Sequence, residues 1–369
     1  MDFGGLPRSK GTEDDRFAAG AILNDGDDGI MKRTNPENGQ HRYYARIFGG
    51  CRIVVTGGAG FLGSNLVRRL LPYAADIVVI DDLYTGRRDV VPSAPNVSFK
   101  QVSVADGPAI RPYLQRADYI FHFAARNIVL SMEQPASDFE VNAKGTMQML
   151  LESAGNIGLR RFVYASTSSI YGNASRLPAE EDQYNVTVPY AASKMCGELL
   201  GIAYGQSFGI PFTALRFSNV FGPGQVSTNP YCGVVTKFME RLVRQEPLQI
   251  FSDGEQTRDF TYVDDAMDAV LDAAASPATK GSVCNIGTGV ETTINELAQR
   301  VCAVTGMPDN YPREYVEKRR IDTVQRRAVS MKRLQASTGW RPRHSLDQGL
   351  LKTWEWYRQE ANVRKGDEA

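Results

Sequence analysis

The sequence predicts an α/β fold in which a doubly wound parallel sheet is joined to a smaller mixed α/β lobe. Three observations predict this fold. Short β-branched and aromatic runs alternate with helical segments from residue 51 to residue 218. The first of these runs ends in a glycine-rich turn, and after residue 218 the alternation gives way to loops and shorter elements. A chain of 369 residues, 42% of them hydrophobic, is long enough for both parts and a sizeable core.

Charge and cysteine content exclude several classes of protein. Lys plus Arg and Asp plus Glu both number 42, so no overall charge attracts nucleic acid or an anionic membrane. The chain has no uncharged apolar run of about 18 residues, which a membrane span needs. The five cysteines are scattered without a Cys-x-x-Cys pair, and the three histidines lack ligand-like spacing. We therefore expect a reduced, cytoplasmic protein without a metal site.

The N-terminal 49 residues have no sustained apolar period. Turn-forming residues cluster at Asn24–Gly29 and Asn35–Gly39, which is typical of disorder. We expect residues 1–49 to form a disordered extension. The alternative is that Arg42–Phe48 docks on the folded body or on a partner.

The folded body is expected to begin with a strand at Arg52–Thr56 and a glycine turn. Gly57 permits the tight turn, Gly60 lets the backbone approach a pyrophosphate, and Gly63 allows close packing of helix on strand. Leucines then recur at helical spacing, so a helix N-terminus at Phe61 and Leu62 would face the pyrophosphate. Strand, turn and helix in this order predict a dinucleotide site.

The acid after the second strand indicates which dinucleotide binds. The run Ile77–Ile80 is followed by Asp81 and Asp82, which lie about 20 residues after the glycine turn. An acid at this offset hydrogen-bonds the adenosine ribose diol and repels a 2′-phosphate. The sequence therefore favours NAD over NADP.

Later strands place further groups at the same edge of the sheet. The run Tyr119–Phe123 ends in Ala124 and Ala125, which are small enough to leave room for a cofactor, and His122 is expected to be a packed core residue. The strand Arg161–Ala165 follows a predicted helix over 138–153. Because ligands of parallel sheets bind at the carboxyl ends of strands, Ser166–Ser169 should reach the site. Residues 51–218 are thus predicted to form a Rossmann-type NAD-binding domain.

A tyrosine and a lysine one helical turn apart form the candidate catalytic pair. Tyr190 and Lys194 leave the same face of a helix that Pro189 starts. A free tyrosine titrates near pH 10, so a neighbouring positive charge is needed to make the phenolate accessible. Lowering the pKa of Tyr190 by about three units requires roughly 4 kcal/mol, which a lysine and an oxidised nicotinamide can supply.

Residues 219–369 are predicted to form mainly a substrate-binding lobe, while a segment at about 259–287 returns to the NAD-binding domain. Loops at Asn219–Gly224 and Pro230–Gly233 precede a helix near Val234–Arg244 and a strand at Leu248–Phe251. A last helix is expected near Ser345–Arg358.

Taken in order, these motifs resemble the extended short-chain dehydrogenase/reductases that act on nucleotide sugars, and they are most similar to UDP-sugar 4-epimerases. The resemblance extends from about residue 51 to residue 358. It rests on Gly57–Gly63, Asp81-Asp82, His122–Ala125, Ser166–Ser168, Tyr171-Gly172, Tyr190-x-x-x-Lys194, Asn219 before Gly-Pro, Arg258–Asp264, and Arg320 ahead of Gly339-Trp340.

The resemblance implies a mechanism and a set of contacts. Tyr190 as phenolate would remove a proton from a sugar hydroxyl while hydride passes to NAD⁺, and Lys194 would hold the nicotinamide ribose. Thr167 would hydrogen-bond the reacting oxygen. The other implied cofactor contacts are Gly57, Gly60, Phe61, Leu62, Gly63, Asp81, Asp82, Ser103, Val104, Phe123, Ala124, Ala125 and Ser166. The implied substrate contacts are Ser168, Asn219, Asn229, Arg258, Arg320 and Arg327.

Two further points follow from the resemblance. Many relatives have Gly-Asp after the third strand, where the acid meets the adenine, whereas this chain has Val102-Ser103. The resemblance also implies a homodimer formed through the helices near 138–153 and 190–208.

The residues after Thr167 distinguish the possible reactions. Sugar 4,6-dehydratases have Asp-Glu at this position and UDP-glucuronate decarboxylases have Ser-Glu, whereas this chain has Ser168-Ser169. A 4-epimerase needs no extra acid, because the 4-keto sugar turns over in the pocket and takes the hydride back on its other face. The sequence therefore predicts an NAD-dependent nucleotide-sugar 4-epimerase.

Several alternatives stay open. Arg327, in the basic run Gln325–Arg327, can meet a phosphate or a sugar carboxylate, or lie on the surface. It keeps a UDP-glucuronate decarboxylase or 4-epimerase as the second hypothesis. A 4,6-dehydratase, a ketoreductase and a non-catalytic NAD-sensing regulator are further alternatives.

Overall fold

The computed structural model describes residues 36–226 and 232–367, and the burial of side chains within 39–226 and 232–360. Its central element is a seven-stranded parallel sheet with the order β11-β6-β5-β4-β1-β2-β3. The strands of this sheet are β1 (Arg52–Thr56), β2 (Asp76–Asp81), β3 (Val97–Gln101), β4 (Tyr119–His122), β5 (Arg161–Thr167), β6 (Phe212–Phe217) and β11 (Ser282–Ile286).

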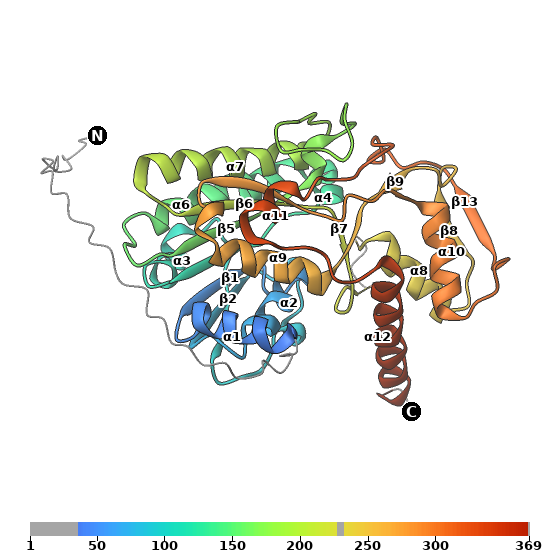
Figure 1. Ribbon diagram of the computed structural model, residues 1–369, viewed down its shortest axis with the longest axis horizontal. Coiled ribbons are helices and arrows are strands. Elements are labelled where there is room, and N and C mark those ends of the chain that lie inside the picture. The colour runs from blue at the N-terminus through green and yellow to red at the C-terminus, as the bar shows by residue number, and fades with distance from the viewer. Residues whose placement is uncertain (1–35, 227–231, 368–369) are drawn as a thin grey trace, which may run out of the picture. The chain divides into compact units, whose positions relative to one another are not determined.

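Helices cover both faces of this sheet, which confirms the predicted α/β fold (Figure 1). In β1, Ile53 and Val55 pack on one face and Val54 packs on the other, because successive side chains of a strand alternate. One layer contains α2 (Phe61–Leu70) and α9 (Val263–Ala275). The other layer contains α3 (Gly107–Leu114), α6 (Thr146–Ser153) and α7 (Pro189–Phe208).

Shorter helices complete the segment between β4 and β5. The chain passes through α4 (Ile128–Glu133), α5 (Pro135–Asp138) and a π-helical stretch, η2 (Phe139–Gly145), before α6. A 3₁₀ turn, η3 (Ser168–Tyr171), follows β5 directly. The other 3₁₀ turns are η1 (Arg88–Val90) and η4 (Pro277–Thr279).

The order in which strands are added to the sheet reverses between β1 and β4. The chain runs outward from β1 through β2 to β3 and then crosses to the opposite side of β1 to form β4. Ligands of doubly wound sheets bind in the crevice at this reversal, outside the carboxyl ends of the strands. The topology therefore places the dinucleotide crevice at the ends of β1 and β4.

A smaller lobe is built from three two-stranded sheets and three helices. β7 (Asn219–Phe221) pairs with β10 (Phe260–Tyr262), β9 (Thr257–Arg258) with β12 (Thr292–Thr293), and β8 (Leu248–Phe251) with β13 (Arg313–Val316). The helices are α8 (Val234–Val243), α10 (Ile294–Thr305) and α12 (Leu346–Asp367). The short α11 (Lys332–Thr338) precedes α12. Among the residues that the structure describes, no helix is both long enough and apolar enough to cross a bilayer.

The segment from β10 through α9 to β11 leads the chain back from the smaller lobe to the sheet. β11 pairs in parallel with β6 and forms the edge of the seven-stranded sheet. Its residues Cys284 and Ile286 are fully buried in the core. The sheet is therefore completed by residues that lie between two parts of the smaller lobe in sequence, Asn219–Tyr262 before β11 and the elements from Thr292 onward after it.

The expectation that residues 1–49 are disordered is wrong for the segment that the structure describes. Residues 36–48 form α1 (Pro36–Phe48), in which Tyr44 and Phe48 are fully buried. They lie four residues apart and so share one helix face. The Tyr44 hydroxyl donates to Asp272 of α9 (2.9 Å), and Phe48 packs edge-on against Tyr119 of β4. One buried face over a single short segment gives no sustained apolar period, so the sequence pattern missed this helix.

Because α1 buries only one of its faces, truncation of its buried and exposed aromatic side chains should change the free energy of unfolding by different amounts. Phe48→Ala should lower the free energy of unfolding by about 3–5 kcal/mol, because it leaves a cavity in the core. Tyr43→Ala, at a side chain that is 36% exposed, should cost about 1 kcal/mol or less. Urea denaturation of the full chain measures both, and equal losses in the two variants would show that Phe48 contributes nothing to the core.

Candidate active site

The glycine turn between β1 and α2 fits the backbone of a dinucleotide site. Gly57 has a φ of +68°, and a Cβ built there would lie 2.6 Å from the backbone nitrogen of Ala124. A Cβ on Gly63 would overlap the carbonyl oxygen of Gly57. The turn is therefore packed against both the β4 loop and the start of α2, and it leaves the helix N-terminus open to a phosphate. Phe61 and Leu62 lie in this first helical turn, and their side chains pack against the core.

Asp81 is held in place at the end of β2. Its two carboxylate oxygens accept the N–H groups of Ala59 and Leu83, both at 2.9 Å. Burial raises the pKa of Asp81, and these two hydrogen bonds oppose the rise. Each carboxylate oxygen keeps a second lone pair, so the group can also accept the hydroxyls of a ribose diol.

The predicted cofactor residues gather around one small cavity of about 90 Å³. Its lining includes Gly57, Gly60, Asp81, Asp82, Val104, Phe123, Ala124 and Ala125. Ser103 lies outside this lining, and its hydroxyl accepts the N–H of Ala105. Val102, which stands at the position of the relatives' glycine, lines the cavity, whereas Ser103 stands at the position of their acid. A glycine cradle, a helix N-terminus and a fixed carboxylate together fit NAD.

Thr167, Tyr190 and Lys194 come together at the carboxyl end of β5. Tyr190 and Lys194 lie one turn apart in α7, whose first residue is Pro189. The Thr167 side chain lies close enough to Tyr190 to lower the pKa of its phenol, and its hydroxyl accepts the N–H of Ser169 at 3.1 Å. The structure thus brings together the three residues predicted to be catalytic.

Burial shifts the pKa values of this pair in opposite directions. It raises the pKa of Tyr190 to about 12, while the Thr167 hydrogen bond lowers it and the Asp138 carboxylate raises it further. It lowers the pKa of Lys194 to about 7, although Asp138 and Glu198 favour the ammonium. Lys194 is only 1% exposed, and its Nζ lies 4.3 Å from the centre of the Tyr164 ring. The protein alone therefore keeps the tyrosine protonated, and it needs an additional positive charge in the site to form the phenolate.

A buried ion pair holds α7 against the sheet. Arg216 of β6 forms two hydrogen bonds to Glu198 of α7, at 2.8 and 2.9 Å, and both side chains are at most 5% exposed. The Ser166 hydroxyl also donates to Glu198, so this predicted cofactor residue is bonded to the ion pair. Sequence reasoning missed this network. The arginine inside the apolar run Phe212–Phe217 is the signal that could have revealed it.

A second buried cluster, also missed, lies on the other side of Lys194. Asp138 is 2% exposed and accepts the Asn142 amide at 2.5 Å. The same amide contacts Ser193 at 3.3 Å, next to Lys194. Asn142 is in the π-helical stretch η2, where the irregular backbone turns its side chain toward α7. Sequence alone gives no signal for a π-helix.

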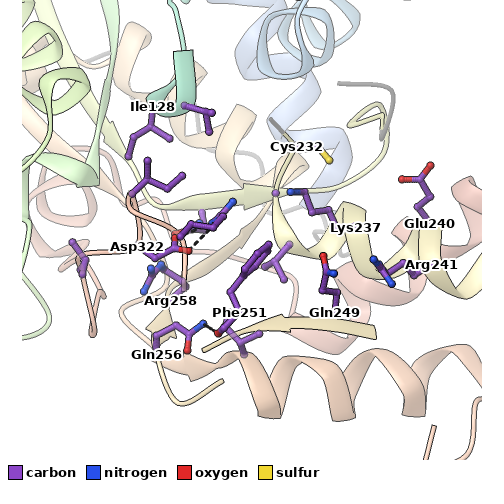
Figure 2. Close-up of a pocket in the computed structure, with 18 of the residues that line it drawn as sticks. Ile128, Cys232, Lys237, Glu240, Arg241, Gln249, Phe251, Gln256, Arg258 and Asp322 are labelled. Atoms are coloured by element: carbon purple, nitrogen blue, oxygen red, sulfur yellow. Dashed lines mark hydrogen bonds and ion pairs between the residues drawn. The ribbon is translucent and has the colours of Figure 1, made fainter. Parts of the chain in front are cut away.

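A larger cavity of about 510 Å³ extends from Ser169 into the smaller lobe. Asn219 and Arg258 line it, together with Arg319, Asp322 and Lys237. Figure 2 shows Arg258 and Asp322 close together at one part of the cavity, and Lys237, Gln249 and Arg241 at another. Burial lowers the pKa of Arg258. The Asp322 carboxylate opposes this shift, and the Arg319 guanidinium adds to it. Clustered guanidinium groups of this kind bind phosphate oxygens bidentately.

The structure places two of the predicted substrate residues outside the lining of this cavity. Arg320 is exposed and lies outside the cavity lining, whereas its neighbour Arg319 lines the cavity. Arg319 is also exposed, but it pairs with Asp322, which lines the same cavity. Similarly, Ser169 lines the cavity while Ser168 is buried outside the lining. Asn229 lies outside the described residues.

Arg327 is the most unusual charge in this cavity. It lies within hydrogen-bonding range of Ser169, with its Nη1 3.5 Å from the hydroxyl oxygen, and its Nε is buried without a partner. Burial lowers the pKa of Arg327 to about 9, and the adjacent Arg258 lowers it further. Within residues 36–226 and 232–367, no carboxylate pairs with this guanidinium. A buried cation of this kind is suited to an anionic ligand.

Comparison with known proteins agrees with this site. The family model described as "NAD dependent epimerase/dehydratase family" matches residues 53–287. The chain therefore belongs to the NAD-dependent epimerase/dehydratase family, which confirms the resemblance to extended short-chain dehydrogenase/reductases.

Individual relatives differ in their activities. The chain is 35% identical over 317 residues to a UDP-glucose 4-epimerase of Mycolicibacterium smegmatis, covering 84% of this chain and 99% of that protein. It is 30% identical to a UDP-N-acetyl-alpha-D-glucosaminuronate decarboxylase of Bacillus cytotoxicus, with coverages of 84% and 99%. The crystal structure of UDP-glucose 4-epimerase with UDP-glucose from Thermotoga maritima superposes with a TM-score of 0.78 at 33% identity, with coverages of 84% and 99%.

The burial of Lys194 predicts how stability changes with pH. Because the pKa of Lys194 is lowered from 10.5 to about 7, the unfolded chain binds one more proton between these values. The cost of burying the ammonium is therefore fully present below pH 7 and is relieved as the pH rises toward 10.5. Relative to Lys194→Met, the wild type should gain up to about 1.4 kcal/mol of unfolding free energy per pH unit in this window.

Urea denaturation at pH 7 and pH 9.5 measures this difference. The matched control is Lys144→Met, which removes an exposed lysine from the neighbouring helical segment. The same pH dependence in both variants would show that Lys194 is not desolvated.

Proposed function

We propose that this protein is a UDP-hexose 4-epimerase that uses NAD. The proposal rests above all on the surroundings of Thr167, Tyr190 and Lys194. In the sequence, Thr167 is followed by Ser168 and Ser169. Neither has a carboxylate that could take a second proton from the sugar. Such residues do not assist the elimination of water or the loss of a carboxyl group. A 4-epimerisation needs only one acid–base group.

Each residue of the trio has one task in this reaction. The Tyr190 phenolate takes the proton of the sugar 4-hydroxyl and returns it to the same oxygen after the ring has turned over. Lys194 contributes positive charge that favours the phenolate. Thr167 hydrogen-bonds the phenol and orients it toward the sugar. NAD, when bound, supplies the group that accepts the hydride and gives it back.

The raised pKa of Tyr190 links catalysis to cofactor binding. In the protein alone, burial dominates and keeps the phenol protonated. The positive charge of an oxidised nicotinamide beside Tyr190 and Lys194 favours the phenolate. The base therefore forms only when the oxidised cofactor is in place, and this protects against side reactions of a free phenolate.

The larger cavity binds the nucleotide part of the substrate in this proposal. Asn219, Arg258 and Arg319 would hold the diphosphate, because planar guanidinium groups match phosphate oxygens. The uridine linkage is supported by the relatives whose names specify UDP-sugars.

A homodimer is part of the same proposal. The outer face of α6 and α7 exposes Leu151, Leu199 and Phe208, with Leu199 and Phe208 each 58% exposed. A helical face with this many exposed apolar side chains is typical of an interface. A second copy of this chain packed on α6 and α7 would cover it.

Arg327 favours a second candidate, an enzyme of acidic UDP-sugars. Its guanidinium lies beside Ser169, next to the catalytic Thr167, and has no carboxylate partner in the described part of the chain. A uronate carboxylate would neutralise it and satisfy the buried Nε. The relative named as a glucosaminuronate decarboxylase supports this candidate.

Loss of the tyrosine hydroxyl tests the mechanism. Tyr190→Phe should reduce turnover by about 10²–10⁴-fold, because general acid–base catalysis contributes that much, while NAD binding stays unchanged. Turnover is read with the accepted sugar nucleotide and NAD content by absorbance after denaturation. Tyr184→Phe, at a side chain 69% exposed, is the control. Full activity of Tyr190→Phe would rule out this base.

A substrate panel decides between the two candidates. The purified protein is incubated separately with UDP-glucose, UDP-N-acetylglucosamine and UDP-glucuronate, and the products are separated by chromatography coupled to mass spectrometry. A product of unchanged mass and altered retention is expected, and it identifies the epimerised sugar. Loss of the carboxyl mass from UDP-glucuronate would replace the epimerase proposal with decarboxylation.

The Arg327→Met variant shows whether a sugar carboxylate is recognised. If it is, turnover of UDP-glucuronate should fall by about 10-fold or more, since a charge-assisted hydrogen bond is lost, while neutral sugars are affected less. Arg326→Met is the matched control, because Arg326 is exposed and paired with Glu291. Equal effects of Arg327→Met on acidic and neutral sugars would assign the arginine to the phosphates.

A further inference from the structure

An ion pair spans the cofactor cavity. Arg126, in the loop after β4, donates to Asp82, in the loop after β2, with an Nη2–Oδ2 distance of 2.7 Å and an Nη1–Oδ1 distance of 3.4 Å. The guanidinium also stacks on the ring of Tyr84, 3.9 Å from its centre. The two charged side chains are 11% and 26% exposed, and both residues line the cavity.

The strand order places this ion pair above the glycine turn. β1 lies between β4 and β2 in the sheet, so the loops that bear Arg126 and Asp82 emerge on either side of it. A side-chain contact between these loops must therefore pass over the carboxyl end of β1. That position is occupied by Gly57–Gly60, the segment that a dinucleotide pyrophosphate approaches.

Beneath this ion pair the cavity is too small for the cofactor. It measures about 90 Å³, whereas pockets that enclose ligands of this size span roughly 300–1,000 Å³. The wall opposite the glycine turn includes Arg126 itself. A dinucleotide that occupies this part of the crevice would therefore displace the Arg126 side chain.

The backbones at both ends of the ion pair are fixed, so the movable part is the contact between the side chains. The N–H of Arg126 donates to the Asn142 amide oxygen at 2.7 Å, and its carbonyl accepts the same amide at 3.0 Å. Asp82 accepts the N–H of Tyr84 at 3.1 Å, which holds the carboxylate toward the loop. An arginine side chain with fixed backbone can swing away by rotating its own torsions.

We propose that Asp82 and Arg126 form a gate over the adenosine half of the cofactor cavity. The gate opens when the ion pair and the stacking on Tyr84 break, and it closes again over the bound dinucleotide. This inference rests on the proposed use of NAD but not on which sugar is converted. It predicts that the gate slows both entry and exit of NAD.

The effect of a gate differs from that of a ligand contact. Loss of a contact speeds dissociation alone and weakens affinity to the same extent. Loss of a gate lowers the barrier in both directions, so both rates rise and the equilibrium constant changes little. Rates and affinity measured together therefore separate the two roles.

The test uses the full chain as purified with NAD, and two variants that loosen the gate: Arg126→Met, which removes the ion pair, and Tyr84→Leu, which removes the ring on which the guanidinium stacks. Dissociation is followed as the exchange of bound NAD⁺ for isotopically labelled NAD⁺, without any sugar, and affinity by equilibrium titration. Exchange should accelerate about tenfold or more in both variants, as expected for loss of a charge-assisted contact, with the dissociation constant changed by less than about threefold.

The matched control is Arg87→Met. Arg87 pairs with Asp89 in the same loop after β2, but both side chains are exposed and neither lines the cavity. Exchange in this variant should equal that of the wild type. Thermal unfolding of all variants checks that each is folded, and added NaCl should accelerate exchange in the wild type more than in Arg126→Met, because salt screens the ion pair.

Two results would overturn the proposal. Unchanged exchange in Arg126→Met and Tyr84→Leu would show that the ion pair and its stacking do not limit the movement of NAD. A dissociation constant that rises in step with the exchange rate would make Arg126 a direct contact of the cofactor. Both readouts are independent of sugar conversion, so a failed substrate panel leaves their outcome interpretable.

Discussion

The position of the catalytic helix depends on one buried ion pair. Arg216 and Glu198 tie α7 to β6, and Ser166 joins the pair from β5. Buried ion pairs add little net stability, but an unpaired partner is costly, so they select one arrangement of the elements. Gly197 and Gly201 let α7 approach the sheet, since a Cβ at either position would overlap the ring of Tyr164 or Phe212. Lys194 is buried because the helix lies this close.

The cofactor cavity and the larger cavity differ in the charged residues that line them. The cofactor cavity has acids at the end of β2 and one arginine that is paired. The larger cavity gathers six basic residues against three acidic ones, Glu240, Glu246 and Asp322, and it includes Arg258, Arg319 and Arg327. Carboxylates suit a diol and guanidinium groups suit a diphosphate, so this difference in charge agrees with the proposed ligands of the two cavities.

Much of the fold could be predicted from local sequence, because apolar runs bounded by turn residues mark buried parallel strands. β1 and β8 begin and end at the predicted residues, and the glycine turn identified the crevice. What local patterns miss depends on tertiary contacts. The burial of Tyr44 and Phe48 comes from α9 and β4, and the position of Arg319 at the cavity comes with its ion pair to Asp322. The contacts of Asn142 arise from a π-helix, which no residue pattern in the sequence predicts.

The late position of β11 in the chain has a consequence for biosynthesis. On the ribosome, the edge of β6 emerges more than sixty residues before its neighbour, as the interval from Phe217 to Ser282 shows. Until then the unpaired edge of β6 is a template for wrong pairing between nascent chains. Completion of the sheet must wait until the first part of the smaller lobe and α9 have been translated, so release of a chain truncated before residue 282 would leave an exposed edge and a strong tendency to aggregate.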